Sequence, residues 1–338
     1  MIAQTFQQSK WVFSKGEDLV LFGGATILAI CGSFYVESLA NYFWMFILFD
    51  QPHVFTTYFY TYTSDRFSTK FKTPLILLPI VCFLLSLLMW KGVSDDFAYA
   101  VLSNFSAFHF AKQQSAWFFI SSAKEGKSQV APKFEGYVDK FVIYASVAGP
   151  LLLSMTDIIG RSGWRKQGDL IQVPVFFEWP IYIIGVISWI AYLVIQVQKY
   201  RTEKKITWGK HFHLVNALFI WSIYRLTMSP QLSIIGQLLI VFGHSFPYIY
   251  LGLRYYESRQ EKERFWPGIK NLKVMAILVV LAGVFISYME VLSEAKWYAN
   301  GIIPCIWLGL IFSHFLIDTF MWKRETHPEG LQFLKDRE

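Results

Sequence analysis

Apolar residues in this chain fall into long runs separated by short polar segments, the pattern of membrane-spanning helices. A hydrocarbon core of about 30 Å requires roughly 17–25 mainly apolar residues of each helix. Ten stretches meet this requirement: 18–34, 36–60, 73–90, 97–121, 138–158, 174–198, 208–229, 232–256, 272–290 and 299–322. The second is unusually polar. The pattern predicts an all-α, polytopic integral-membrane helix bundle that forms a single domain over residues 1–338.

Composition and charge support this prediction and add an orientation. The chain is 54% hydrophobic and 16% charged, with a mean hydropathy of +0.37, whereas a soluble core of this size would carry more charge. With both termini cytoplasmic, the cytoplasmic segments and adjoining span ends, Lys199 and Lys210 included, hold 20 Lys and Arg against five outside. This asymmetry follows the positive-inside rule, so the net charge of +7 indicates topology and not a nucleic-acid partner. We expect a multi-pass protein of the bacterial inner membrane.

Four histidines lie in apolar surroundings where a polar side chain is costly. They are His53, His109, His244 and His314, on the second, fourth, eighth and tenth predicted spans. Counted to the inner ends of those spans at 1.5 Å per residue, they lie roughly 10–18 Å from the cytoplasmic surface. We therefore expect them to share one layer in the inner half of the membrane.

Each of these histidines has a polar residue at helical spacing. Gln113 follows His109, Tyr248 follows His244 and Asp318 follows His314, each by four residues, and Asp50 precedes His53 by three. Residues at these spacings lie on the same helix face. Because intramembrane ionisable groups are costly without partners, they mark functional sites by default.

Three interpretations suit this set of residues: a metal site, a proton or ion path, and hydrogen-bonded packing. A shared depth on four helices favours a compact metal site, because a proton path would spread through the bilayer. Histidine with carboxylate, and no cysteine paired in the same way, is typical of non-haem iron, with copper and zinc as alternatives. The predicted metal ligands are His53, His109, His244, His314, Asp50 and Asp318, and the predicted catalytic residues are Tyr248 and Gln113.

Two further features of the sequence allow more than one interpretation. His211 and His213 begin the seventh predicted span and could reach the lower edge of the histidine layer. Aromatic residues crowd the histidine-bearing spans. They suit either the interfacial belts of a membrane protein or a pocket for a flat, apolar, lipid-dissolved substrate.

The four segments that contain these histidines also resemble known proteins. DQPHVFTTYFYTYTSDRF (50–67), FHFAKQQSAWFFISSAKEG (108–126), GHSFPYIYLGLRYYESR (243–259) and SHFLIDTFMWK (313–323) resemble a group of bacterial polytopic membrane proteins with D-x-P-H near the N-terminus and H-x-x-x-D near the C-terminus. More remotely, the placement of histidines at a common membrane depth is similar to that in the Brp/Blh-type carotenoid-cleaving oxygenases. That similarity implies an intramembrane, histidine-ligated iron. The dense H-x-x-H-H boxes of membrane desaturases are missing.

The sequence thus predicts a membrane-bound, iron-dependent oxygenase or related oxidoreductase. Its partners would be membrane lipids, a lipophilic small-molecule substrate and an electron donor that the sequence leaves undefined. The alternative is a transporter of a metal ion or small solute that binds its cargo through the same His/Asp cluster. A third reading is a scaffold in which replacing His109 or His314 changes stability only.

Overall fold

The protein is all-helical, as the sequence predicts. The computed structural model describes residues 10–34, 50–125, 132–156, 170–204, 206–226, 230–259, 272–294, 301–322 and 334. No strand occurs among them. Their helices are α1 (Lys15–Asp18), η1 (Leu19–Gly24), α2 (Ala25–Ser33), α4 (Gln51–Thr63), α5 (Asp65–Lys70), α6 (Lys72–Gly92), α7 (Asp95–Glu125), α8 (Pro132–Met155), η2 (Val175–Phe177), α9 (Glu178–Glu203), α10 (Trp208–Leu226), α11 (Pro230–Arg259), α12 (Leu272–Glu294) and α13 (Ile302–Trp322).

Six helical segments in the described residues are long and apolar enough to cross a membrane. They are Lys15–Ser33, Lys72–Gly92, Phe134–Met155, Val175–Glu203, Ile235–Arg259 and Ile302–Thr319. All six coincide with predicted spans, which indicates an integral membrane protein. The other four predicted spans correspond to α4, α7, α10 and α12, which do not combine that length and hydropathy within the described residues; α12 contains a shorter apolar stretch, Lys273–Phe285.

The second predicted span, 36–60, differs most from the structure. Helix α4 begins only at Gln51 and ends at Thr63, and residues 35–49 lie outside the described part of the chain. Pro52 occupies the first turn, where its missing N–H and fixed φ are tolerated and favour helix initiation. His53 therefore lies in the first turn of a short helix.

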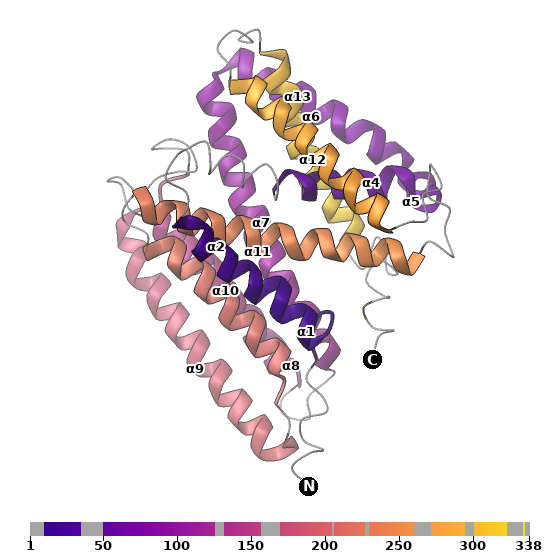
Figure 1. Cartoon of the computed structure of the whole chain (residues 1–338). Helices are drawn as coiled ribbons and strands as arrows, with labels where there is room; N and C mark the ends of the chain where they lie inside the picture. The colour runs from indigo at the N-terminus through magenta and orange to yellow at the C-terminus, as the bar shows by residue number, and fades with distance from the viewer. Residues whose placement is uncertain are drawn as a thin grey trace. The chain divides into compact units, whose positions relative to one another are not determined.

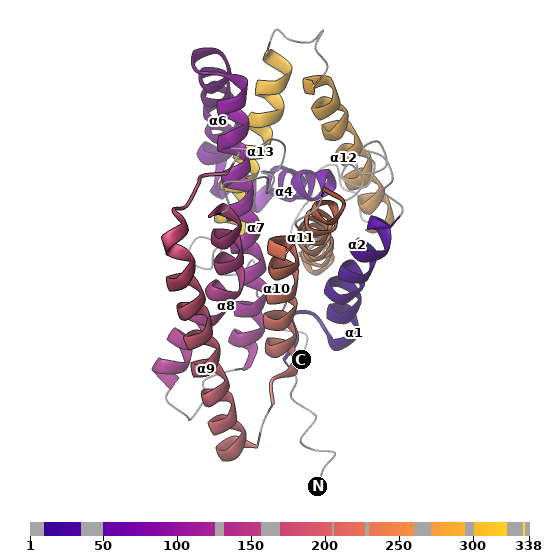
Figure 2. The same ribbon diagram turned by 90° about the vertical axis from the view of Figure 1, so that its left-hand side faces the viewer.

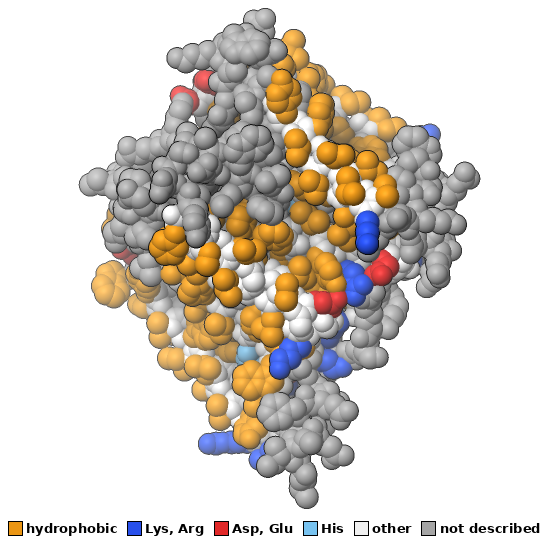
Figure 3. Space-filling model, in the orientation of Figure 1, with side chains coloured by type: hydrophobic (Ala, Val, Ile, Leu, Met, Phe, Trp, Pro, Cys, Tyr) orange, Lys and Arg blue, Asp and Glu red, His pale blue; other side chains and the backbone are white. Residues whose placement is uncertain are grey.

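Helices α6 and α9 expose most of their apolar surface. Only 17% of the apolar window of each helix is buried within the protein, although their mean hydropathies are 2.3 and 2.0. Figure 3 shows hydrophobic side chains over α9, with Lys and Arg side chains gathered at its lower end. Apolar surface of this extent on a soluble protein would drive association, whereas in a bilayer it contacts lipid chains.

The helices form two compact units, each assembled from segments that are not contiguous in sequence. Unit 1 contains Met1–Phe34 and Ser106–His244, and unit 2 contains Tyr35–Phe105 and Ser245–Glu338. The boundaries fall inside α7 and α11, so each of these helices contributes residues to both units.

In unit 1, α8 packs between α9 and α10 (Figures 1 and 2). These three helices and the end of α7 enclose a buried ion cluster. Lys210 Nζ lies 2.8 Å from Asp139, 3.2 Å from Glu135 and 3.4 Å from Glu125. Lys199 Nζ forms ion pairs with Glu125 and Glu135. Lys210 and Lys199 are only 0% and 3% exposed, so they are buried ion-pair partners and not free surface charges.

The pKa of the Glu125 carboxyl group reflects the lysines around it. Burial by itself would raise its pKa, but Lys210, Lys199 and the Thr207 hydroxyl together outweigh burial and leave the pKa below its ordinary value. The carboxylate is therefore ionised in the folded protein at neutral pH. The cluster links the ends of four helices.

In unit 2, α6 packs along α13, and α4 packs against α12 (Figure 2). Trp307, Leu308 and Ile311 of α13 join Val54 of α4 and Cys82 of α6 in a buried apolar cluster. Aromatic rings extend this core, because Trp90 packs on Tyr99 and Tyr99 on Trp307. This core holds α4 and α13, which carry His53 and His314.

Candidate metal centre

His53 is held by the residues that precede its helix. Its Nδ1 is hydrogen-bonded to the backbone carbonyl oxygen of Asp50 and lies 3.3 Å from Asp50 Oδ1. The Ser245 hydroxyl lies 3.3 Å from the same nitrogen and donates to Asp50 Oδ1 at 3.2 Å. A carbonyl oxygen can only accept a hydrogen bond, so Nδ1 carries the proton and the lone pair of the ring lies on Nε2.

His314 has the same tautomer for a different reason. Its Nδ1 lies 2.9 Å from the Thr57 hydroxyl oxygen. The single hydrogen of Thr57 is donated to Asp318 Oδ1 at 2.6 Å, so Thr57 can only accept from the imidazole. Nδ1 of His314 therefore carries the proton, and its lone pair also lies on Nε2. Burial is 98% for His53 and complete for His314, which are 2% and 0% exposed.

The two rings lie close together in unit 2. Their centroids are 4.9 Å apart at an interplanar angle of 73°. Tyr248 packs against both, with centroid distances of 5.8 Å to His53 and 6.2 Å to His314. In metal sites a ligating histidine usually donates its second ring N–H to a carbonyl, carboxylate or other acceptor, which fixes the tautomer and the ring orientation. Both histidines have this arrangement, with Nε2 as the donor atom for a metal.

Two glycines allow the close packing that positions α4. A Cβ on Gly252 of α11 would lie 2.5 Å from Thr56 Cγ2 and 2.5 Å from Tyr60 Cε2. A Cβ on Gly283 of α12 would lie 2.5 Å from Pro52 Cγ. Contacts below 3.0 Å are not tolerated, so both positions require the absence of a side chain. The backbones of α11 and α12 therefore pack directly against Thr56 and Pro52, the neighbours of Thr57 and His53.

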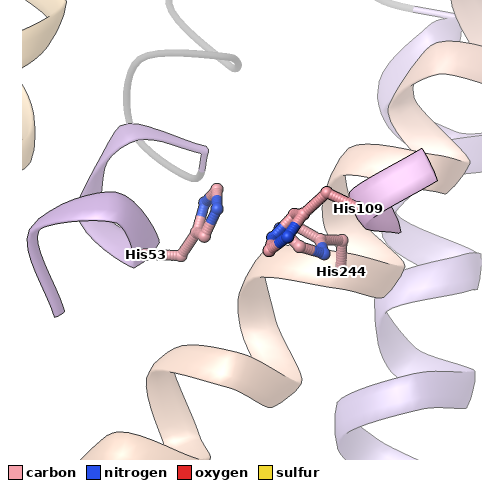
Figure 4. Close-up of side chains that lie close together, drawn as sticks. All are labelled: His53, His109 and His244. Atoms are coloured by element: carbon pink, nitrogen blue, oxygen red, sulfur yellow. The ribbon is translucent and has the colours of Figure 1, made fainter. Parts of the chain in front are cut away.

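The other two histidines form a pair in unit 1. His109 of α7 and His244 of α11 have ring centroids 5.1 Å apart at 75° (Figure 4). Phe110 packs on His244 at 4.3 Å. The Gln113 amide donates to the backbone carbonyl oxygen of His244 at 3.3 Å. Gln113 therefore joins α7 to α11 beside the pair, and this contact supports a positioning role more than the catalytic role predicted for it.

All four predicted histidines are thus arranged in pairs, one pair in each unit. Their nitrogens and a carboxylate oxygen of Asp318 are among the described atoms that could bind a metal ion. Asp50 and Asp318 lie beside His53 and His314, as predicted. Their described contacts favour orientation of the imidazoles, because Asp318 Oδ1 already accepts from Thr57 and Tyr248. The ligand roles predicted for these two aspartates stay predictions.

His211 and His213, whose participation was open, have other contacts. His213 Nε2 lies 2.9 Å from Asp18 Oδ2, and this buried carboxylate also accepts from the backbone N–H groups of Val12 and Phe13. His211 Nδ1 lies 2.8 Å from the Tyr192 hydroxyl. These contacts anchor the chain before α1 and the start of α10.

Sequence reasoning missed three residues of this site: Thr57, Ser245 and Trp322. The first was detectable, because Thr57 follows His53 by four residues and so shares its helix face. Trp322 follows Asp318 by the same spacing, and its indole N–H donates to the Tyr248 hydroxyl at 2.9 Å. Ser245 adjoins His244 in sequence but contacts the Asp50–His53 pair of unit 2.

No protein-family model, curated protein or solved structure matches this chain.

Proposed function

We propose that the protein is an integral-membrane oxidoreductase in which histidines hold a non-haem iron ion that reacts with dioxygen and a lipophilic substrate. The observation that carries this proposal is the shared tautomer of His53 and His314. In each ring the hydrogen bond at Nδ1 places the proton on that nitrogen, so Nε2 carries the lone pair through which a metal would bind. Packing alone does not require two buried imidazoles to be oriented in the same way.

The pair in unit 1 provides two further imidazoles that could bind a metal ion. His109 and His244 bring two more imidazoles at a centroid distance of 5.1 Å. Helix α11 carries His244 and, one turn later, Tyr248, which packs on the unit 2 histidines.

The donor set favours iron over the alternatives. Nitrogen ligands with carboxylates nearby suit iron, whereas structural zinc and electron-transfer copper sites typically include cysteine. Among the described residues Cys31 is exposed, Cys82 and Cys305 are buried, and none joins either histidine pair. When bound, the ion would supply the oxygen chemistry, and the chain would orient the ligands and exclude water. Lipid-facing α6 and α9 make lateral entry of a lipophilic substrate possible.

The finer topology is part of the same proposal. We infer that both termini are cytoplasmic and that α7, α10 and α12 cross the membrane with the six apolar segments. The 31 residues of α7 would extend about 46 Å at 1.5 Å per residue, which exceeds the hydrocarbon core. Impermeant thiol labelling of single cysteines introduced next to each helix end tests this assignment.

Elemental analysis of detergent-solubilised protein tests the metal site. We expect stoichiometric iron that survives dialysis in the wild type and is lost in His53→Ala and His314→Ala. His211→Ala is the matched control, since it removes an imidazole that bonds Tyr192, and it should retain iron. Weakly held, exchangeable metal would favour the transport alternative. Retention of iron by both His53→Ala and His314→Ala would refute the proposed ligand set.

A further inference from the structure

Tyr248 is the hub of a hydrogen-bond network beside the histidines of unit 2. Its hydroxyl donates to Asp318 Oδ1 at 2.5 Å, lies 2.6 Å from the Thr57 hydroxyl and accepts from the Trp322 indole N–H at 2.9 Å. The ring is 2% exposed. A structural tyrosine needs one hydrogen-bond partner, whereas this hydroxyl has a carboxylate, an alcohol and an indole around it.

The carboxylate distinguishes Tyr248 from its aromatic neighbours. One-electron oxidation of a phenol leaves a strongly acidic radical cation, so a buried tyrosine gives up an electron readily only if its proton has an acceptor. Asp318 Oδ1 is such an acceptor at hydrogen-bond distance. Tyr60 is equally buried, at 1% exposure, but its hydroxyl has no hydrogen-bond partner among the described residues. Its proton has no acceptor there.

We propose that Tyr248 and Trp322 form a redox-active pair that delivers single electrons to the metal ion of the proposed site. This inference rests on the proposed function. In the first step Tyr248 would give one electron to the bound, oxidised ion, and its phenolic proton would move to Asp318. The products are a neutral tyrosyl radical and a neutral carboxyl group. Because the phenol loses its proton together with its electron, no radical cation is left in a buried site.

Trp322 lies where it can reduce the Tyr248 radical by one electron. The two rings have centroids 6.0 Å apart at 89°, and the indole N–H already points at the phenolic oxygen. In the second step Trp322 loses one electron to the Tyr248 radical, and Asp318 returns its proton to the phenolic oxygen. Trp322 is only partly buried, so a small one-electron reductant of the enediol class, such as ascorbate, can then reduce the indole radical.

Electron paramagnetic resonance tests the pair without any substrate. Iron(II)-loaded protein is exposed to dioxygen and frozen, and the radical is quantified. We expect a tyrosyl signal in the wild type, its loss in Tyr248→Phe and its retention in Tyr60→Phe, which removes an equally buried hydroxyl. In Trp322→Phe the signal should persist, and its decay on addition of ascorbate should slow several-fold.

Asp318→Asn provides a second variant that keeps the side-chain shape but cannot take up the proton. The amount of radical per oxidised iron should fall to the level of Tyr248→Phe in this variant. Iron content and iron oxidation are measured on every sample. Bound iron that is oxidised without a radical in the wild type, or a radical that survives Tyr248→Phe, overturns the redox pair alone. Failure of the wild type to bind iron overturns the proposed function, and the pair with it.

Discussion

Thr57 provides a direct test of how the site is oriented. Its hydroxyl accepts from His314 Nδ1 and donates to Asp318 Oδ1, and the residue is 0% exposed. Replacing it by valine keeps the volume and β-branching but removes both hydrogen bonds and the contact with the Tyr248 hydroxyl. The His314 N–H then has no acceptor at this position, and the imidazole loses the contact that fixes its tautomer. We expect iron affinity to fall because the Nε2 lone pair is no longer held in place.

The magnitude follows from the contacts. Loss of a hydrogen bond that orients a metal-bound histidine typically weakens metal binding about 10–100-fold, or about 1.4–2.8 kcal/mol. Burying the unpaired imidazole N–H costs about 1–3 kcal/mol of folding stability in addition. Anaerobic titration of detergent-solubilised protein with iron(II), followed by calorimetry, measures the first effect. Thermal unfolding without metal measures the second.

Two variants of the same helix serve as controls. Thr57→Ser keeps the hydroxyl and should bind iron with nearly wild-type affinity. Thr61→Val makes the identical substitution one turn later, at a residue that is also 0% exposed, whose hydroxyl bonds only to backbone carbonyls of α4. It should leave iron affinity unchanged. Wild-type affinity in Thr57→Val, or an equal loss in Thr61→Val, would refute the orienting role.

The remaining predictions concern stability in detergent. Lys210→Met leaves three buried carboxylates with one ammonium group and should cost about 3–5 kcal/mol of unfolding free energy, against less than about 0.5 for the exposed control Lys140→Met. The pKa of Glu125 is lowered on folding, so its stabilisation is present above the ordinary value of 4.5 and is lost as the pH falls through the folded pKa. The stability gap between wild type and Glu125→Gln should therefore narrow in acid, and a gap that widens there would contradict this sign. Gly252→Ala should destabilise by about 1–3 kcal/mol through overpacking, while Gly185→Ala, with no neighbour within 4 Å, should not.

Much of the helical architecture follows from hydropathy alone. Apolar length identifies α6, α9 and α13 because each must satisfy its backbone hydrogen bonds within one segment. Hydropathy does not predict the bounds of α4. Its threonines and tyrosines were included in an unusually polar predicted span, whereas the helix begins near Pro52. Local spacing predicted the neighbours of the histidines, but the contacts that matter cross between helices.

The polar residues show why spacing was insufficient. Asp318 was expected on the helix face of His314, but His314 Nδ1 and Asp318 Oδ1 are 3.8 Å apart and Thr57 bonds to both side chains. Tyr248 was paired with His244 by its spacing of four, but its hydroxyl bonds to residues of α4 and α13. Lys199 looked like a surface charge because nothing in the sequence near it reveals carboxylates on α7 and α8. Such partners depend on how the helices pack together, which the residue spacing within one helix does not predict.

The hydrogen bond between His314 and Thr57 joins residues 257 positions apart in sequence, with consequences for biosynthesis. Helix α4 leaves the ribosome long before α13 exists, so at that stage Thr57 lacks its side-chain partners His314 and Asp318. Polar groups left in that condition in hydrocarbon are costly, which makes α4 a poor candidate for early independent insertion. We expect nascent chains that end before α13 to expose α4 to membrane-protein quality control, and the binding site to mature only after synthesis is nearly complete.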